Sequence, residues 1–424
     1  MERSRHSIDP SEIGSAIEQR QGQPRMMELV ARESLSPFLS ALHDSQPVRG
    51  LTHDFYRYPA RFSPEFARAV IESFSEPGDV VLDPFVGGGT TLVEARVAGR
   101  LGVGADRSSL AVFAARAKTT VLSGRDRERL RRWAQRLTPK LNTRTPIPAT
   151  PNLEGSPRNL DSTSTWRLRK LVAIAVNDAA RLPATRVERF ARCAILRTGQ
   201  WALDGRDTIP TVDQFRSRFR EIVDEMLQGA EEFERRARDA DRLAAGVGVR
   251  RTVCLKADAG KLAGYACFGK RPPPKLVLTS PPYPGIHVLY NRWQIMGRRE
   301  TAAAFWIAGG EDDNEPSELT FGDRRSHHDS SRYYSDLEGA FRSVGGLLDR
   351  ESLVVQLVAF SQPGVQLPRF LSAMERAGYR EVHLSARNGR ANRQRREVPN
   401  RKWYANQWGL NGTRREVLLF HQLA

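Results

Sequence analysis

The sequence predicts an α/β protein, in which helices cover both faces of a mostly parallel sheet and a helical insert interrupts the sheet. Three observations favour this fold class. Short apolar segments alternate with segments of helical periodicity over residues 79–118, and strands resume after residue 253. Between these stretches, residues 119–250 have mostly helical periodicity. A glycine-rich loop joins the first strand to the first helix, as in doubly wound sheets.

Residues 51–118 are predicted to form the first part of the sheet. Apolar segments rich in β-branched residues and bounded by Pro or Gly indicate strands, whereas Ser or Thr before a 3.6-residue period indicates a helix. The elements predicted here are the strand 79–83, the helix 90–98, the strand 101–105 and the helix 108–118.

Residues 119–250 form the predicted helical insert, and residues 251–424 complete the sheet. The insert has helical periodicity at 125–137, 165–180, 187–197 and 212–243. Strands then follow at 253–257, 276–280, 353–360, 381–385 and 416–421, with helices at 333–348 and 367–378. Residues 1–50 are polar and are predicted to be a partly flexible N-terminal extension with a short helix at 26–42.

The composition narrows the class of partner. The 424 residues include 66 Lys and Arg against 49 Asp and Glu, a formal net charge of +17. Such an excess suits a polyanion such as nucleic acid, although an Arg-rich codon bias produces the same charge. No apolar run approaches the roughly 18 residues of a membrane helix, and the charged N-terminus lacks the apolar core of a secretory signal. We therefore expect a soluble cytoplasmic protein, associated with the nucleoid.

The cysteines and histidines do not indicate a metal site or a disulfide framework. Cys193, Cys254 and Cys267 are odd in number and lack the spacing of metal ligands. The pair His327-His328 has no matching carboxylate or Cys spacing, so we interpret it as loop surface.

The glycine-rich loop indicates a ligand site. It runs Asp83-Pro84-Phe85-Val86-Gly87-Gly88-Gly89-Thr90-Thr91. Gly87 and Gly89 permit a tight turn and the close approach of a ligand, and the helix beginning at Thr90 directs its free N–H groups to the same place. No Gly-Lys-[Ser/Thr] follows, and the spacing is not the Gly-x-Gly-x-x-Gly of NAD-binding folds.

Carboxylates follow three of the predicted strands, namely Asp83, Asp106 and Asp258. Asp106 has the spacing from the glycine loop at which an acidic residue accepts hydrogen bonds from ribose hydroxyls. Asp258 ends the strand 253–257 and is expected to face an adenine ring. Because no Lys or Arg is placed to clamp a phosphate, these residues favour a non-phosphorylated adenosyl cofactor, S-adenosylmethionine.

A second motif, Thr279-Ser280-Pro281-Pro282-Tyr283, stands at the carboxyl end of the strand 276–280, where open α/β sheets place their active sites. Together with the glycine loop it resembles the amino-group DNA methyltransferases, which methylate cytosine N4 or adenine N6 with S-adenosylmethionine. The resemblance covers about residues 52–118 and 250–424 and implies a Rossmann-like class I methyltransferase sheet.

The resemblance also implies a set of cofactor contacts. The stretch 53–62 (HDFYRYPARF) is similar to the family segment that closes over the methionine end of the cofactor. The residues expected to bind the cofactor are Tyr58, Phe62, Asp83, Pro84, Phe85, Gly87, Gly89, Thr90, Thr91, Asp106 and Asp258.

The expected catalytic residues are Ser280, Pro281, Pro282 and Tyr283. An exocyclic amine is a weak nucleophile because its lone pair is delocalised into the ring. A rigid Pro-Pro turn holds the side-chain oxygen of Ser280 and the carbonyl of Pro281 as acceptors for the two amine hydrogens. Tyr283 is expected to stack on a base swung out of the duplex. The structural alternative is a strand-ending turn with a packed Tyr.

Two features bear on the target atom. Methylation at cytosine carbon 5 needs a thiolate, which that family carries after a proline. None of the three cysteines follows a proline, which argues against that chemistry. Ser280 stands where adenine enzymes usually carry Asp or Asn, which favours cytosine N4 over adenine N6.

Two basic regions, 285–330 and 387–415, are predicted to contact double-stranded DNA. The second contains nine Arg or Lys and one Glu, interleaved with aromatic residues. A solvated basic loop is the alternative. The DNA-binding residues expected are Arg292, Trp293, Arg298, Arg393, Arg395, Arg396 and Trp403. The arginine-bearing face of the insert could either contact DNA or only support the core.

Two other functions remain open at this stage. Guanine-N2 RNA methyltransferases have a similar glycine loop that ends in Glu-Ala, as Glu94-Ala95 does here, but normally carry Asp or Asn before Pro-Pro. A non-catalytic DNA-binding protein could retain the same fold. A restriction endonuclease partner is compatible with the class, and the sequence does not specify the oligomeric state.

Overall fold

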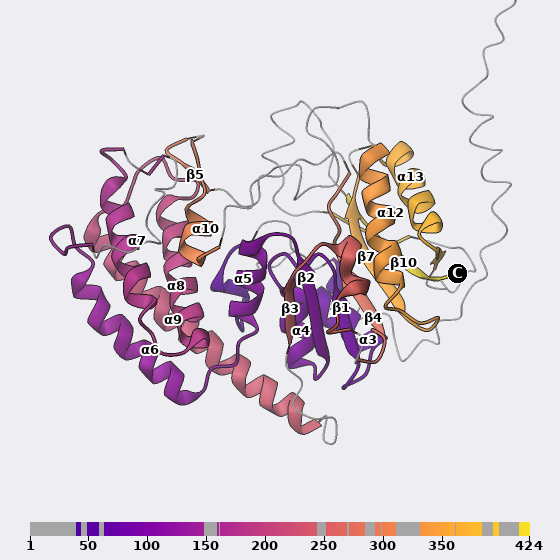
Figure 1. The fold of residues 1–424 in the computed structure, drawn as a ribbon, viewed down its shortest axis with the longest axis horizontal. Helices are drawn as coiled ribbons and strands as arrows, with labels where there is room; N and C mark the ends of the chain where they lie inside the picture. The colour runs from indigo at the N-terminus through magenta and orange to yellow at the C-terminus, as the bar shows by residue number, and fades with distance from the viewer. Residues whose placement is uncertain are drawn as a thin grey trace, which may run out of the picture.

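The computed structural model describes residues 40–43, 49–58, 63–147, 159–160, 162–243, 252–268, 271–284, 293–297, 299–310, 331–360, 362–383, 393–397 and 415–424. A central sheet lies beside a layer of long helices (Figure 1). Most of the helix expected at 26–42 lies outside the described residues. No helix in the described ranges is long and apolar enough to cross a membrane.

The sheet has the strand order β3-β2-β1-β4-β7-β10-β8, and β9 pairs with β10. Its strands are β1 (Val80–Asp83), β2 (Leu101–Asp106), β3 (Val253–Lys256), β4 (Leu276–Thr279), β7 (Leu353–Ala359), β8 (Tyr379–Val382), β9 (Arg395–Glu397) and β10 (Arg415–Leu423). The first five are parallel neighbours, whereas β10 runs antiparallel to β7 and β8. The chain order reverses at the β1–β4 boundary, the position at which such sheets bind ligands. The predicted fold class is confirmed.

Helices cover both faces of the sheet. Successive residues of a strand point to opposite faces, so an apolar strand such as β1 makes both faces apolar and both must be covered. Val81 packs in one core cluster with α3 (Pro64–Phe74) and α4 (Thr90–Val97). Its neighbours Val80 and Leu82 pack in another, with α12 (Ser331–Gly345) and α13 (Pro363–Arg376). Helix α3 was not among the predicted elements, although Ser63 caps it and Pro64 begins it.

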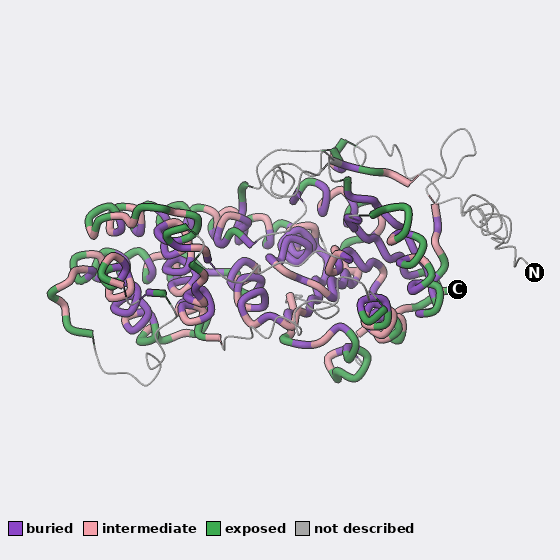
Figure 2. The backbone as a smooth tube through the Cα atoms, turned by 90° about the horizontal axis from the view of Figure 1, so that it is seen from above, coloured by how far each residue is buried: buried purple, intermediate pink, exposed green. Residues whose placement is uncertain are grey.

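The helical layer contains α6 (Gly124–Leu137), α7 (Trp166–Ala179), α8 (Thr185–Leu203) and α9 (Val212–Leu243). The last three elements of the layer, β5 (Trp293–Ile295), β6 (Arg299–Thr301) and α10 (Ala303–Ala308), come from the chain after β4. Side chains from both segments share one buried core. Figure 2 shows buried residues throughout this layer. The helical layer is therefore assembled from the insert and from a segment that follows the Ser-Pro-Pro-Tyr motif.

Helix α5 (Ser109–Lys118) lies between the sheet and the helical layer, and α9 also joins them (Figure 1). Arg96 of α4 forms an ion pair with Asp241 of α9, with 2.7 Å between Nη2 and Oδ2. Near the middle of α9, a Cβ added to Gly229 would lie 2.1 Å from the carbonyl oxygen of Leu51. The backbone of the segment before β1 therefore packs directly on α9.

We expect Gly229→Ala to lower the free energy of unfolding by about 1–3 kcal/mol, because the added methyl overlaps a backbone atom. The matched control is Gly339→Ala in α12, where a Cβ meets no atom within 4 Å. That change should stabilise the protein by about 0.5–1 kcal/mol, the ordinary advantage of Ala over Gly in a helix. Urea unfolding monitored by circular dichroism measures both. Equal effects of the two substitutions would contradict the contact.

Candidate active site

The glycine loop adopts a backbone that only glycine permits without strain. Gly87 and Gly89 have φ angles of 46° and 81°, in the left-handed region. A Cβ on Gly89 would also lie 2.9 Å from the Cα of Ala115 in α5. Gly88 is equally confined, because its Cβ would lie 2.9 Å from the Cβ of Tyr58. The predicted tight turn is present, and Tyr58 lies directly on it.

Asp83 joins the glycine loop to the Ser-Pro-Pro-Tyr turn. Its Oδ2 accepts a hydrogen bond from Thr91 Oγ1 (2.8 Å), and its Oδ1 accepts one from Thr279 Oγ1 (2.7 Å). The backbone N–H of Phe85 donates to Oδ1 as well (3.1 Å). Since β1 and β4 are adjacent parallel strands, two motifs 196 residues apart lie side by side at one edge of the sheet.

The carboxyl of Asp83 is 2% exposed. Burial raises the pKa of Asp83 to about 6, against the lowering effect of the three hydrogen bonds that it accepts. The group that connects the two motifs therefore titrates at a higher pH than an ordinary carboxyl.

The other two predicted carboxylates stand at the neighbouring strand ends. Asp106 accepts hydrogen bonds from the backbone N–H groups of Gly87 and Ser108, each at 2.9 Å, and burial raises the pKa of Asp106. Asp258 follows β3, and its Oδ2 lies 3.9 Å from Nε of Arg107. A carboxylate oxygen has more than one acceptor position, so these acids can still accept hydrogen bonds from a ligand.

The segment before α3 is anchored by a buried acid of α4. Glu94 accepts hydrogen bonds from His53 Nε2 (2.7 Å) and Arg68 Nε (2.8 Å). Burial raises the pKa of Glu94, but the hydrogen bonds and charges of His53 and Arg68 together hold it below its usual value. These contacts hold the segment that carries Tyr58 against the glycine loop. Phe62, the other residue predicted from this segment, lies outside the described residues.

Hydrogen bonds within the protein orient the side chain of Ser280. Its Oγ lies 2.9 Å from the carbonyl oxygen of Leu357 and 2.9 Å from Oη of Tyr283. The hydroxyl has one proton, which either partner takes, and its oxygen lone pairs can accept a hydrogen from a ligand. The carbonyl of Pro282 accepts a hydrogen bond from Tyr333 Oη (2.7 Å). Among the described residues, no hydrogen bond to the carbonyl of Pro281 is found.

The sequence analysis missed Glu416, which lies behind this turn. Glu416 on β10 is 4% exposed and accepts a hydrogen bond from Tyr283 Oη (2.7 Å). Its other oxygen accepts one from Nε of Arg396 on β9 (2.6 Å). A chain of contacts therefore leads from Ser280 through Tyr283 and Glu416 to Arg396. The available signal was an acidic residue directly before the apolar run 417–420.

The structure contradicts the DNA-binding role expected of Trp293. Its ring is 2% exposed, packs in the core of the helical layer and donates from Nε1 to Tyr56 Oη (3.2 Å). A ring buried in this way cannot stack on a base. Arg292, Arg298 and Trp403 lie outside the described residues, as do His327 and His328.

The three arginines predicted to bind DNA at and just before β9 (Arg393, Arg395 and Arg396) also differ from the prediction. Arg396 is 7% exposed and paired with Glu416, so its charge is not available to a phosphate. Arg393 forms two hydrogen bonds to Glu381, at 2.6 and 2.7 Å. Only Arg395, of these three, is exposed to solvent. We interpret the pairs Arg396–Glu416 and Arg393–Glu381 as structural, because their acidic partners belong to the strands β10 and β8.

The strand order, the glycine turn and the carboxylates at the strand ends define the class: a Rossmann-like methyltransferase sheet. Residues 25–115 match the family model N6_N4_Mtase, described as DNA methylase. This match confirms, over those residues, the resemblance to the amino-group methyltransferases. The match covers the glycine loop and Asp106, and it supports a methyltransferase related to the N6/N4 DNA methylases.

Comparisons with other proteins add little beyond the fold. No curated protein matches the chain. TrmN from Thermus thermophilus has 13% sequence identity and a TM-score of 0.30, with 86% of this chain and 50% of TrmN covered, so the chain spans half of that structure. The rRNA methyltransferase aviRa from Streptomyces viridochromogenes has 12% identity and a TM-score of 0.28, with 92% and 94% covered. TM-scores this low support no conclusion about the substrate.

The raised pKa of Asp83 predicts a pH-dependent stability. The folded-state value of about 6 exceeds the 3.8 of a free Asp. Its stabilising effect is therefore fully present below about pH 4 and is lost as pH rises through about 6. We expect the wild type to lose at most about 3 kcal/mol relative to Asp83→Asn between about pH 4 and 7.

Chemical unfolding of both proteins across that pH range measures this difference. Asp224→Asn, on an exposed face of α9, controls for the loss of one negative charge. If the wild-type and Asp83→Asn curves run parallel from pH 4 to 7, the carboxyl titrates normally and the prediction is wrong.

Proposed function

We propose that this chain is a DNA methyltransferase that acts on the exocyclic amine of a base rotated out of the duplex, with cytosine N4 favoured over adenine N6. One observation carries the proposal: Asp83 binds Thr91 of the glycine loop and Thr279 of the Ser-Pro-Pro-Tyr turn at the same time. A cofactor site and a base site that share one carboxylate lie close enough for direct group transfer.

The glycine loop and the flanking acids would hold the cofactor. Asp106 would accept hydrogen bonds from ribose hydroxyls, because backbone N–H groups fix it at the end of β2 beside Gly87. Asp258 would face the adenine, and Tyr58 would cover the loop from the side of the preceding segment. When bound, S-adenosylmethionine supplies an electrophilic methyl group.

The turn after β4 would hold the amine. Ser280 Oγ and the carbonyl of Pro281 would accept the two amine hydrogens, which concentrates the nitrogen lone pair towards the cofactor side. The proton of Ser280 is directed to Leu357 or Tyr283, so its oxygen is presented to the base as an acceptor. No strong general base is required, because the nitrogen loses its proton after it has gained the methyl group.

Ser280 and the family match support the choice of target. A neutral hydroxyl at this position is similar to the cytosine-N4 subgroup, and the matching family model is described as DNA methylase. A flipped base would stack on Tyr283, whose hydroxyl is held by Glu416 at 2.7 Å.

The product identifies both the substrate and the target atom. We expect purified protein with S-adenosylmethionine and unmethylated duplex DNA to yield 4-methylcytosine, detected by mass spectrometry after digestion to nucleosides. Ser280→Ala should lower the rate by about 10²-fold or more while cofactor binding, measured by calorimetry, stays unchanged. 6-Methyladenine alone would exclude cytosine N4. Transfer only to RNA, or none at all to DNA, would overturn the proposed function.

The role of Tyr283 can be divided between its ring and its hydroxyl. Tyr283→Phe keeps the ring but loses the contacts to Ser280 and Glu416, whereas Tyr283→Ala loses both. If the ring stacks on the base, Phe should retain most activity and Ala should cost about 1–3 kcal/mol in kcat/KM for DNA. Equal losses in the two variants would assign the role to the hydroxyl and contradict stacking.

A further inference from the structure

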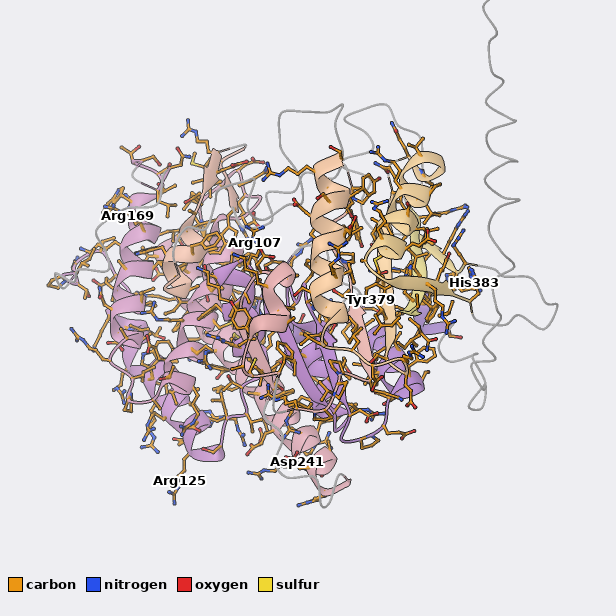
Figure 3. All side chains as sticks on the ribbon, turned by 45° about the vertical axis from the view of Figure 1, so that its right-hand side comes forward. Arg107, Arg125, Arg169, Asp241, Tyr379 and His383 are labelled. Carbon is orange, nitrogen blue, oxygen red and sulfur yellow. The ribbon has the colours of Figure 1, made fainter. Side chains whose placement is uncertain are left out.

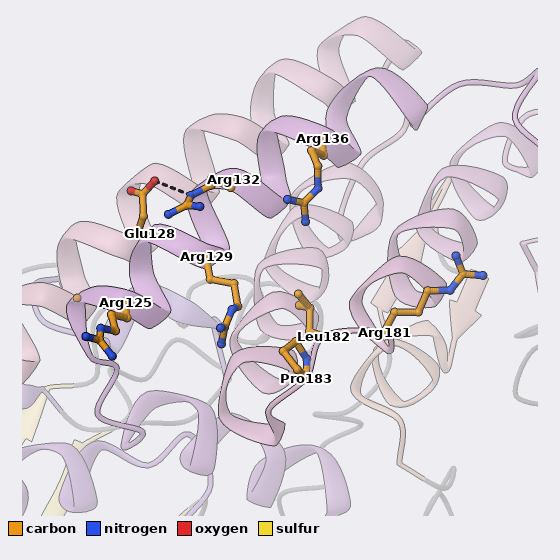
Figure 4. A pocket seen from close by; sticks show the side chains of 9 residues that line it. Arg125, Glu128, Arg129, Arg132, Arg136, Arg181, Leu182 and Pro183 are labelled. Atoms are coloured by element: carbon orange, nitrogen blue, oxygen red, sulfur yellow. Dashed lines mark hydrogen bonds and ion pairs between the residues drawn. The ribbon is translucent and has the colours of Figure 1, made fainter.

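Five arginines and one acid, Glu128, line a cavity of about 620 Å³ on the outer surface of the helical layer. Arg132 pairs with Glu128, and the other four arginines have no such partner among the described residues. Arg125, Arg129 and Arg136 project from one face of α6, and Arg181 belongs to the loop after α7, with its side chain pointing away from α6 in Figure 4. Gly124, Leu182 and Pro183 complete the lining. We call these four arginines the arginine groove. All four are exposed to solvent.

The charges of the arginine groove are not neutralised within the protein. Among the described residues, none of its four guanidinium groups has a carboxylate within the 4.0 Å of an ion pair. Neighbouring arginines of α6 do have partners: Arg127 pairs with Glu234, and Arg131 and Arg132 both pair with Glu128. Four unpaired cations in one cavity repel one another, which a bound anion would relieve.

The length of the groove selects an extended anion. Arg125 and Arg136 are eleven positions apart on α6, a rise of roughly 16 Å at about 1.5 Å per residue. A single phosphate or nucleotide cannot contact both ends, whereas one strand of duplex DNA presents a charge about every 3.4 Å along its axis. Guanidinium groups bind the paired oxygens of phosphate and of carboxylate alike, so the choice between a phosphodiester and a carboxylate chain is left to the binding test.

The groove is separate from the candidate active site. Figure 3 places Arg125 at the opposite end of the helical layer from Arg169, and well away from Arg107, which follows the end of β2. An anion held in the groove therefore does not occupy the cofactor or base site.

We propose that the arginine groove binds the sugar–phosphate backbone of double-stranded DNA and does so without reading its bases. The choice of DNA rests on the proposed function, but the presence of an extended polyanion site rests on the groove alone. The helical insert then contributes affinity at a distance from the site of chemistry.

The test measures binding and not methyl transfer, so it stays informative if the proposed activity fails. Full-length protein is titrated into a fluorescein-labelled duplex of mixed sequence, at several salt concentrations, with anisotropy as the readout. The groove variant is Arg125→Gln, Arg129→Gln and Arg136→Gln together. The control, Arg235→Gln, Arg236→Gln and Arg242→Gln on α9, removes the same charge from arginines that pair with carboxylates.

We expect the groove variant to bind duplex DNA about tenfold more weakly or worse. Its slope of log affinity against log salt should fall by about 2–3, one contact for each lost arginine. The control should keep the wild-type affinity and slope. Equal losses in the two variants would overturn the proposal. So would a loss confined to polyglutamate or to single-stranded RNA, tested in parallel, because either result assigns the groove to a different partner.

Discussion

The hydrogen bonds of Asp83 are the constraint on which the arrangement of the site depends. A carboxyl without partners would be costly to bury in this way, but here two threonine hydroxyls and a backbone N–H donate to it. Thr91 belongs to the helix after β1, and Thr279 ends β4. The same residue therefore sets the position of the cofactor loop and of the Ser-Pro-Pro-Tyr turn. If either motif shifted, the buried Asp83 would lose a hydrogen bond. That loss would be costly, so the two motifs are held beside each other.

The helical layer is coupled to this site through two chain segments. The segment before α3 contacts the glycine loop through Tyr58, and it is held to α8 by Gln200, which exchanges hydrogen bonds with the backbone of Arg57. The chain leaves the Ser-Pro-Pro-Tyr turn at Pro284 and is next described at Trp293, inside the helical core. Both the cofactor side and the base side of the site are thus attached to the helices. The insert is consequently part of the structural support of the site.

The sheet and the main helices could be predicted because their signals are local. A buried strand such as β1 is a short apolar run, and α9 repeats its apolar residues over 32 positions. Of the elements that were missed, β5, β6 and α10 are only three to six residues long and carry no such repeat. Helix α3 was missed although its cap Ser63 and first residue Pro64 are helix-start signals. The glycine loop was predictable for a different reason. Its backbone has positive φ angles at Gly87 and Gly89, which favour glycine, so the residue type itself marks the turn.

Charge partners could not be predicted in the same way, because they are set by pairing between distant strands. Arg396 and Glu416 are 20 positions apart, and Arg393 and Glu381 are 12 apart, and only the register of β8, β9 and β10 brings them together. Counting cations in a segment therefore overestimated the charge available to DNA there. For the arginine groove, too, the ion pairs decide how much charge is available to an anion. In α6, helical spacing places Arg125, Arg129, Arg132 and Arg136 on one face. Arg132 pairs with Glu128, whereas the other three form no ion pair with the described residues. The net charge of +17 is thus distributed unevenly. A polyanion is attracted by arginines without carboxylate partners that are gathered at one place, as in the arginine groove.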